Sequence, residues 1–301
     1  MSAIVVLGSA NMDLVVRQPR LPHPGETMFG SSFATIPGGK GLNQAVAAAR
    51  AGGDVGFLGA IGRDGFGEAL RRCLEQDGID TSGVREVDDP TGTAHISVLD
   101  GGENAIVVVS GANAAITALD DGSRREIEKA GYLVAQFERP IGLIGEAFVV
   151  ARGLGITTVL TPAPVQRVDE ALLQLTDILI PNAQEACELA GVSDETEAAT
   201  TLSGITDGLI VMTRGSRGAL VARGGKVELE VPPRKVEPVD TTAAGDTFAG
   251  TLVAFLAEGA PLQDALRAAT VAASISVTRP GASTSMPTRA EIDEVLGSGR
   301  V

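Results

Sequence analysis

Short apolar runs alternate with amphipathic stretches along most of the chain. The apolar runs predict strands at residues 4–7, 55–61, 132–136, 157–160, 178–181 and 209–213. Apolar positions spaced three and four residues apart predict helices at 42–51, 66–76, 141–152, 168–174, 183–190, 195–203, 246–258, 262–277 and 289–296. Buried strands that alternate with helices indicate a mainly parallel sheet with helices on both faces, which is an α/β fold.

Other predicted strands have no helix between them. One pair is expected at 14–17 and 26–32, around a proline-rich turn, and another at 93–99 and 104–109. We expect these two pairs to form a small separate sheet that acts as a lid. A late hairpin is predicted at 219–223 and 227–231. The whole chain, residues 1–301, is expected to form a single domain carrying this lid.

Composition narrows the classes of partner. The chain has 38 acidic and 24 basic residues and a net charge of -14, so a nucleic-acid groove or an anionic membrane surface is disfavoured as its ligand. An anionic substrate would need a local positive site. The two cysteines indicate no disulfide framework, and the N-terminal residues resemble neither a signal peptide nor a membrane span. These features favour a cytoplasmic location.

Several common motifs are absent. The sequence GGKG at 38–41 lacks the Ser or Thr that follows the lysine of a phosphate-binding P-loop. Gly65 and Gly67 lack the third glycine of a dinucleotide fingerprint, and the two histidines cannot form a zinc cluster. The commonest hydrolase, dehydrogenase and metalloenzyme classes are therefore disfavoured.

In the stretch DTTAAGDTF at 240–248, small residues directly precede a predicted helix. The first amides of a helix lack intrahelical partners and can bind an anion such as phosphate, if side chains leave room. Asp246 would then lie beside the phosphate, where it can accept a proton from an attacking hydroxyl. The alternative is that Asp246 only caps the helix.

A second stretch, PGGKGLNQAVAAARAGG at 37–53, combines glycines with the donors Lys40 and Asn43. Glycine permits close approach of the backbone to a ligand. Asn11 and Asp13 follow the first predicted strand, and ligands of α/β sheets bind at the carboxyl ends of strands. Turn formation is the alternative role for these two residues.

Together, GGKGLNQAVAAARAG and DTTAAGDTFAG resemble the paired signatures of the ribokinase-like (PfkB) carbohydrate kinases. Further matching segments are LGSANMD, PGET, SGANAAI, PNAQE, TRGSRGA and VTRPGA, so the similarity spans the chain. The resemblance implies ATP-dependent phosphorylation of D-ribose at its 5-hydroxyl. Asp246 would be the base, ionised at neutral pH beside the helix N-terminus. The amides of Ala243, Ala244 and Gly245 would form an anion hole.

The resemblance also assigns the binding residues. The sugar hydroxyls would be held by Asn11, Asp13, Gly39, Lys40, Asn43 and Glu138, and Ala94 and Ile96 of the lid would cover the sugar. Hydrated Mg²⁺ and the phosphates of ATP would be oriented by Asn182 and Glu185, for which a helix cap is the alternative role. The nucleotide would be lined by Thr213, Gly215, Ser216, Gly218 and Gly245. A monovalent cation, K⁺, would be held by Asp240 and by oxygens of Thr242, Ser276, Gly281 and Ser285.

Two departures from the family pattern are His95 in the lid and Arg139 after Glu138, and we expect both to be solvated. Two other functions stay open. The chain could phosphorylate another furanose, such as fructose or deoxyribose, or a nucleoside such as adenosine, or it could be a sugar-binding sensor without transfer activity. The exposed edges of the lid sheet, taken with the resemblance, also predict a homodimer.

Overall fold

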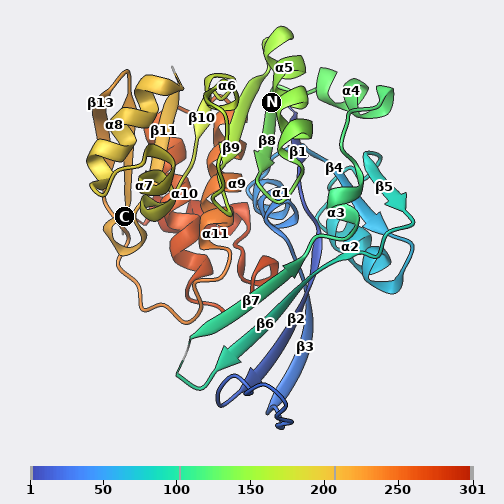
Figure 1. Cartoon of the computed structure of the whole chain (residues 1–301). Coiled ribbons are helices and arrows are strands. Elements are labelled where there is room, and N and C mark those ends of the chain that lie inside the picture. The colour runs from blue at the N-terminus through green and yellow to red at the C-terminus, as the bar shows by residue number, and fades with distance from the viewer. Residues whose placement is uncertain (1–2, 102, 207, 299–301) are drawn as a thin grey trace.

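The structure is a computed structural model that describes residues 3–101, 103–206 and 208–298. The remaining positions of the expected 1–301 domain lie outside the described residues. Figure 1 shows a large sheet between layers of helices, with a narrower sheet projecting from one end.

The large sheet has the order β13-β12-β11-β10-β9-β8-β1-β4-β5. Its pairs are parallel from β5 to β11, and β12 and β13 add an antiparallel edge. This confirms the predicted α/β class. In chain order the strands are β1 (Ile4–Leu7), β4 (Val55–Gly62), β5 (Val84–Val87), β8 (Tyr132–Gln136), β9 (Thr157–Thr161), β10 (Ile178–Leu179), β11 (Leu209–Thr213), β12 (Ala219–Arg223) and β13 (Lys226–Val231).

Alternate residues of these strands enter two hydrophobic cores, one on each face of the sheet. In β1, Ile4 and Val6 enter the first core, whereas Val5 and Leu7 enter the second. The first core is covered by α1 (Lys40–Arg50), α2 (Gly65–Gln76), α9 (Ala244–Ala257), α10 (Leu262–Ser276) and α11 (Arg289–Gly297). The second is covered by α3 (Ala112–Ala115), α4 (Asp121–Glu128), α5 (Ile141–Gly153), α6 (Glu170–Gln174), α7 (Ala183–Ala190) and α8 (Glu195–Ile205).

The narrower sheet has the order β3-β2-β6-β7 and is the predicted lid. Its strands are β2 (Asn11–Gln18), β3 (Ser32–Gly38), β6 (Gly92–Leu99) and β7 (Asn104–Val109). β2 runs parallel to β6, so the two predicted pairs join through their centre. Among the described helices, none has both the length and the apolar character needed to cross a bilayer.

One lid strand was wrongly predicted at 26–32, because β3 occupies Ser32–Gly38. Glu26 belongs to the preceding loop, where its carboxylate accepts hydrogen bonds from Arg20 Nη1 at 2.7 Å and the His23 amide at 2.9 Å. Glu26 therefore organises a loop. β5 and α4 were not predicted at all.

Candidate active site

The sugar-side residues gather where β1 ends and the lid begins. Asn11 opens β2 and is buried, and its Oδ1 accepts a hydrogen bond from Asn113 Nδ2 at 2.8 Å. Asn113 in turn accepts from the Ala10 amide at 3.0 Å. Asn113 was not predicted as a site residue, although it belongs to the SGANAAI segment. It fixes the side chain that the sequence assigned to the sugar.

Three glycines leave the space that these side chains occupy. A Cβ at Gly38 would lie 2.3 Å from Asp13 Oδ2, and one at Gly92 would lie 2.3 Å from Asn11 Oδ1. Gly39 links β3 to α1 with φ of 92°, a conformation that favours glycine. Larger residues at these positions would displace Asn11 or Asp13.

Glu138, which is expected to bind the sugar, connects three segments. Its Oε2 accepts hydrogen bonds from Ser9 Oγ at 2.5 Å and from the Lys40 amide at 3.0 Å. Ser9 Oγ also accepts from the Gly41 amide at 3.2 Å. The end of β1, the end of β8 and the start of α1 are thereby held together. Ser9 was missed because small polar residues after a strand usually form turns.

The helix that carries Asp246 begins with unusual backbone geometry. Ala243, its N-cap, has φ of 57°, and it is the only non-glycine residue with positive φ in the described part of the chain. Such a conformation costs on the order of 1 kcal/mol. The amides of Ala243 and Gly245 have no hydrogen-bond acceptor among the described residues, and the Ala244 amide makes only a 3.3 Å bond to the Thr241 carbonyl. These amides are available to an anion.

Asp246 is held by α1. Gln44 Nε2 donates to Asp246 Oδ1 at 2.9 Å, and Asn43 Nδ2 donates to Oδ2 at 3.3 Å. Gln44 is itself fixed, because its Oε1 accepts from Gln136 Nε2 at 2.7 Å and its Nε2 also approaches Thr161 Oγ1 at 2.9 Å. Gln44, Gln136 and Thr161 were not predicted. A glutamine in an otherwise apolar helical stripe was the available signal for Gln44.

Burial dominates the electrostatics of this site. It raises the pKa of Asp246, with opposing contributions from Lys40 and from the Gln44 hydrogen bond. The helix N-terminus was expected to favour the ionised form of Asp246, whereas burial disfavours that form. Burial, and then the charges of Glu138 and Asp246, raises the pKa of Asp13 to about 7. These shifts require that Asp13, Glu138 and Asp246 lie near one another, as predicted.

Lys40 provides the compensating positive charge. Burial alone would lower the pKa of its ammonium group, but the carboxylates of Asp246, Glu138 and Glu185 outweigh that effect and raise it. Lys40 is therefore charged at neutral pH, and Glu185 of α7 lies within electrostatic range of the sugar side. One lysine among these carboxylates leaves a local excess of negative charge.

The residues assigned to magnesium form a capping box. Asn182 Oδ1 accepts from the Glu185 amide at 2.8 Å, and Glu185 Oε2 accepts from the Asn182 amide at 2.8 Å. The alternative role, a helix cap, is thus observed. Glu185 also lies within electrostatic range of Lys40 and Asp246: burial raises its pKa, and the Asn182 amide and then Lys40 oppose that rise. The described residues contain no group of three or more His, Cys, Asp or Glu placed to hold a metal ion.

The loop assigned to the nucleotide follows β11. Thr213 forms a parallel bridge with Asn182, so this loop is adjacent to the capping box. Gly215 and Gly218 have φ of 56° and 84° around the short helix η1 (Gly215–Arg217), and Ser216 is exposed. A Cβ at Gly218 would lie 2.0 Å from the Val231 carbonyl oxygen. The loop is therefore restricted to glycine at its tightest point.

The predicted cation ligands are only partly brought together. Asp240 accepts hydrogen bonds from Thr242 Oγ1 at 2.6 Å and from the Gly281 amide at 2.9 Å. Burial would raise the pKa of Asp240, but these bonds outweigh burial and lower it. Asp240 is therefore an ionised oxygen donor beside Thr242 and Gly281. Among the described residues, Asp240 makes no hydrogen bond with Ser276 or Ser285.

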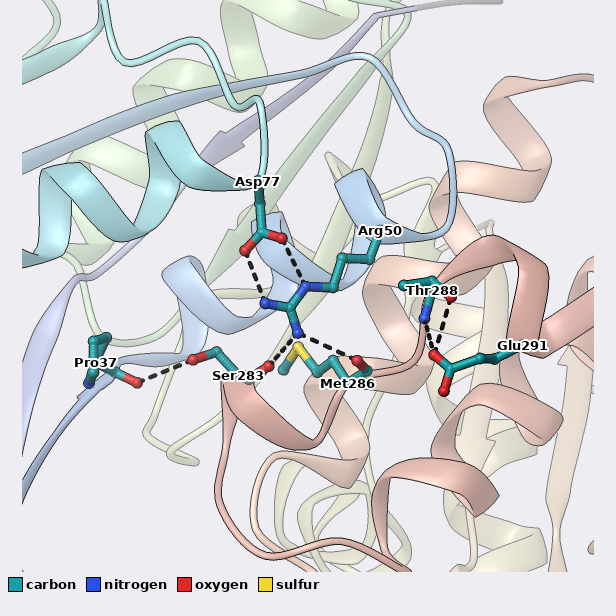
Figure 2. A network of polar contacts seen from close by, with 7 residues as sticks. All are labelled: Pro37, Arg50, Asp77, Ser283, Met286, Thr288 and Glu291. Atoms are coloured by element: carbon teal, nitrogen blue, oxygen red, sulfur yellow. Dashed lines mark hydrogen bonds and ion pairs between the residues drawn. The ribbon is translucent and has the colours of Figure 1, made fainter.

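The loop after Gly281 is fastened to α1 (Figure 2). Arg50 Nη1 donates to the carbonyl oxygens of Ser283 at 2.6 Å and Met286 at 3.2 Å, while its Nε pairs with Asp77 at 2.7 Å. Ser283 Oγ reaches the Pro37 carbonyl of β3 at 3.4 Å. The helix that carries Lys40 and Asn43 thus also holds the loop that contains Ser285.

Ala94 of the lid lies beside Asp13 in the same sheet. Ala94 is paired with Asp13 in the β2–β6 ladder, and Ile96 lies two residues further on the same face. Ala94 is buried and Ile96 half-buried. His95 points to the opposite face and is exposed, as expected. Arg139 is only 3% exposed, so the expectation that it would be solvated is wrong.

The fold and this constellation of residues define a class of protein. Residues 1–289 match the family described as pfkB family carbohydrate kinase, and the chain belongs to that family. Ribokinase from Haemophilus influenzae is 41% identical over 300 residues, covering 97% of this chain and 98% of its own length. Ribokinase from Bacillus subtilis is 41% identical over 298 residues, covering 98% of this chain and all of its own length. A solved structure of Arabidopsis thaliana ribokinase complexed with ribose and ATP is 30% identical, covers 98% of both chains and has a TM-score of 0.92.

Proposed function

We propose that this chain is a kinase that transfers the γ-phosphate of ATP to the 5-hydroxyl of D-ribose. The observation that carries the proposal is the position of Asp246. Its buried carboxylate lies at the start of α9, next to amides without acceptors, and is bonded to the helix that also carries Lys40. The full-length similarity to ribokinases supports ribose as the acceptor.

A polyol requires several fixed donors and acceptors. Asn43 Oδ1 is buried without a hydrogen-bond donor among the described residues, so it can accept from a sugar hydroxyl. The Asp13 carboxylate has no hydrogen-bond donor among the described residues and can accept as well, while the Lys40 ammonium can donate. A substrate that lacks a matching hydroxyl would leave one of these groups buried and unpaired, which disfavours it by about 1–3 kcal/mol for each group.

Asp246 takes the hydroxyl proton in this proposal. Its raised pKa makes it a stronger base than an exposed aspartate, while Gln44 and Asn43 keep it oriented. The amides of Ala243, Ala244 and Gly245 would stabilise charge on the transferred phosphoryl oxygens. Phosphoryl transfer depends chiefly on such positioning and electrostatic stabilisation. Closure of Ala94 and Ile96 over the sugar would exclude competing water.

ATP would lie along the loop that contains Thr213, Ser216 and Gly218. Hydrated Mg²⁺ fits the site, since Glu185 presents a carboxylate and Lys40 alone cannot balance the local negative charge. When bound, the ion would neutralise phosphate charge. Asn182 and Glu185 would orient its water shell.

We also propose a K⁺ site at Asp240. The ionised carboxylate lies beside Thr242 and Gly281 and suits a hard cation, and oxygens of Thr242, Gly281, Ser276 and Ser285 would complete the ligand set. The rate in KCl should exceed the rates in NaCl and in a cation-free buffer of equal ionic strength. Equal rates in all three would remove Asp240 from this role.

A substrate panel tests the acceptor. Purified protein is incubated with ATP, Mg²⁺, K⁺ and one of ribose, deoxyribose, fructose or adenosine, and ADP release is measured. We expect ribose to give the highest kcat/KM, with ³¹P NMR identifying the 5-phosphate. Rapid turnover of fructose or adenosine with negligible turnover of ribose would overturn the assignment. Ribose binding without any turnover would favour a sensor.

The lid would also join two copies of the chain. Its edge strand β7 exposes Ile106, Val107, Val108 and Val109 in succession, and such an edge favours pairing or burial. Light scattering should give the mass of a dimer for the wild type and a lower mass for Val107→Lys. A monomeric wild type at working concentration would contradict this proposal.

A further inference from the structure

Arg139 is a buried cation without a partner. Its side chain lies at the end of β8, directly after Glu138, and only 3% of the residue is exposed. Its Nε and Nη1 atoms have no hydrogen-bond acceptor among the described residues. Buried arginines are almost always paired, because removing an unpaired charge from water is strongly unfavourable. The structure therefore leaves one positive charge to be satisfied.

Arg139 is one of the residues that line a cavity on the side of the main sheet opposite Asp246. The cavity encloses about 230 Å³ including the solvent at its mouth, and its inner part has room for about one water-sized group. Apolar residues form most of its wall, whereas Arg85, Ser123 and Arg139 are its polar members. Leu7 and Leu143 of this wall belong to the second core, on one face of the main sheet. Asp246 lies in α9, which covers the first core on the other face.

The charges around the cavity do not balance. Arg85 pairs with Asp120 at 3.1 Å, and Asp120 also caps α4 by accepting from the Ser123 amide at 2.8 Å. Asp120 does not line the cavity, so it offers nothing to Arg139. Burial, and then repulsion from Arg85, lowers the pKa of Arg139 to about 10. Arg139 consequently keeps its charge at neutral pH. The side chains of Arg85, Asp120 and Arg139 together carry a net charge of +1.

We propose that this cavity binds a tetrahedral oxyanion of the phosphate class, with one oxygen on Arg139 and the others at the mouth beside Arg85 and Ser123. A guanidinium presents several N–H groups in a plane and favours oxyanions over monatomic ions. The narrow interior admits one oxygen, and the exposed Arg85 side chain leaves room for the rest at the surface. The uncapped start of α5 at Pro140 adds a favourable dipole next to Arg139.

Binding is tested on the intact protein whose nucleotide and sugar sites are filled. The protein is saturated with ribose, Mg²⁺ and a non-hydrolysable ATP analogue, and inorganic phosphate is titrated by calorimetry at constant ionic strength. We expect saturable binding of one phosphate per chain. Arg139→Met should abolish it, Arg85→Met should weaken it about 10-fold, and Arg125→Met, an exposed arginine of the same helix as Ser123, should leave it unchanged.

Thermal unfolding provides a second measurement. Phosphate should raise the Tm of the wild type and of Arg125→Met more than it raises the Tm of Arg139→Met. Arg139→Met in phosphate-free buffer should unfold at a higher temperature than the wild type, because the unpaired charge is gone. Should Arg139→Met fail to fold, the weaker phosphate binding of Arg85→Met carries the test, since Arg85 is exposed.

Three results would overturn the proposal. They are the absence of saturable phosphate binding to the filled wild type, equal binding in Arg139→Met, and chloride binding as tightly as phosphate. Ribose 5-phosphate is titrated in parallel to identify the source of the oxyanion. Stronger binding of the sugar phosphate than of inorganic phosphate, lost in Arg139→Met, would assign the site to a phosphate monoester. The reverse order would assign it to free phosphate.

Discussion

Asp13→Asn tests whether the ionised Asp13 carboxylate destabilises the folded chain while it contributes to ribose binding. The Asp13 carboxylate has no hydrogen-bond donor among the described residues, and burial together with Glu138 and Asp246 raises its pKa from 3.8 to about 7. A group whose pKa is higher in the folded state stabilises the fold below its unfolded pKa, and that stabilisation is lost as the pH rises through the folded pKa. Asparagine cannot ionise and should therefore remove a penalty that exists only at higher pH.

The size of the pKa shift of Asp13 sets the expected change in the free energy of unfolding. At 1.36 kcal/mol per pKa unit, the penalty at pH 8 is about 4 kcal/mol, and at pH 5.5 it is about 2 kcal/mol. Asp13→Asn should increase the free energy of unfolding by up to these amounts in the absence of sugar, with no gain near pH 4. The same substitution removes a charged acceptor of sugar hydroxyls, so the KM for ribose should rise by about 10- to 100-fold.

Urea unfolding at pH 8, 5.5 and 4 measures this effect, and ADP release measures the KM. Asp54→Asn, an exposed aspartate away from the site, is the control and should change neither quantity by a measurable amount. A loss of stability at pH 8, or a gain of the same size at all three pH values, would refute the electrostatic reasoning.

Two further predictions concern residues that position the site. Gln44→Met should lower kcat by about 10-fold and move the limb of the pH–rate profile that reports Asp246 to higher pH, because Asp246 loses a hydrogen bond that lowers its pKa. An unshifted profile would leave Gln44 only a packing role. Arg50→Met should destabilise the chain by about 2 kcal/mol and raise the KCl concentration for half-maximal rate several-fold, because the carbonyl groups of Ser283 and Met286 lose their hydrogen bonds to α1. An unchanged KCl dependence would show that this loop does not affect the cation site.

The regular part of the fold could be predicted from local pattern. Helices and strands with strong periodicity, such as α7 and β8, begin and end as expected. The lid was harder, because the loop after Arg20 is held by an ion pair with Glu26 that no periodicity reveals. β5 and α4 are short and partly exposed, so their sequences carry a weak apolar signal.

The candidate site was likewise predictable only in part. The motifs indicated Asp246, Asn43 and Lys40, which the fold brings together. The rise in the pKa of Asp246 could not be predicted, because it depends on burial in the folded chain, and Gln44, which opposes the rise, lies 202 positions away in sequence. Arg139 was expected in solvent because β5 and α4, which supply Arg85 and Ser123 to its cavity, were not predicted.

Asp246 is the residue on which the proposed activity most depends, and Asp246→Asn tests it most directly. Ribose binding is measured by calorimetry and turnover by ADP release. We predict that the dissociation constant for ribose stays within a few-fold of the wild-type value while kcat falls by about 10² to 10⁴, the usual effect of removing a positioned base. Turnover at the wild-type rate would contradict the assignment of Asp246 as the base.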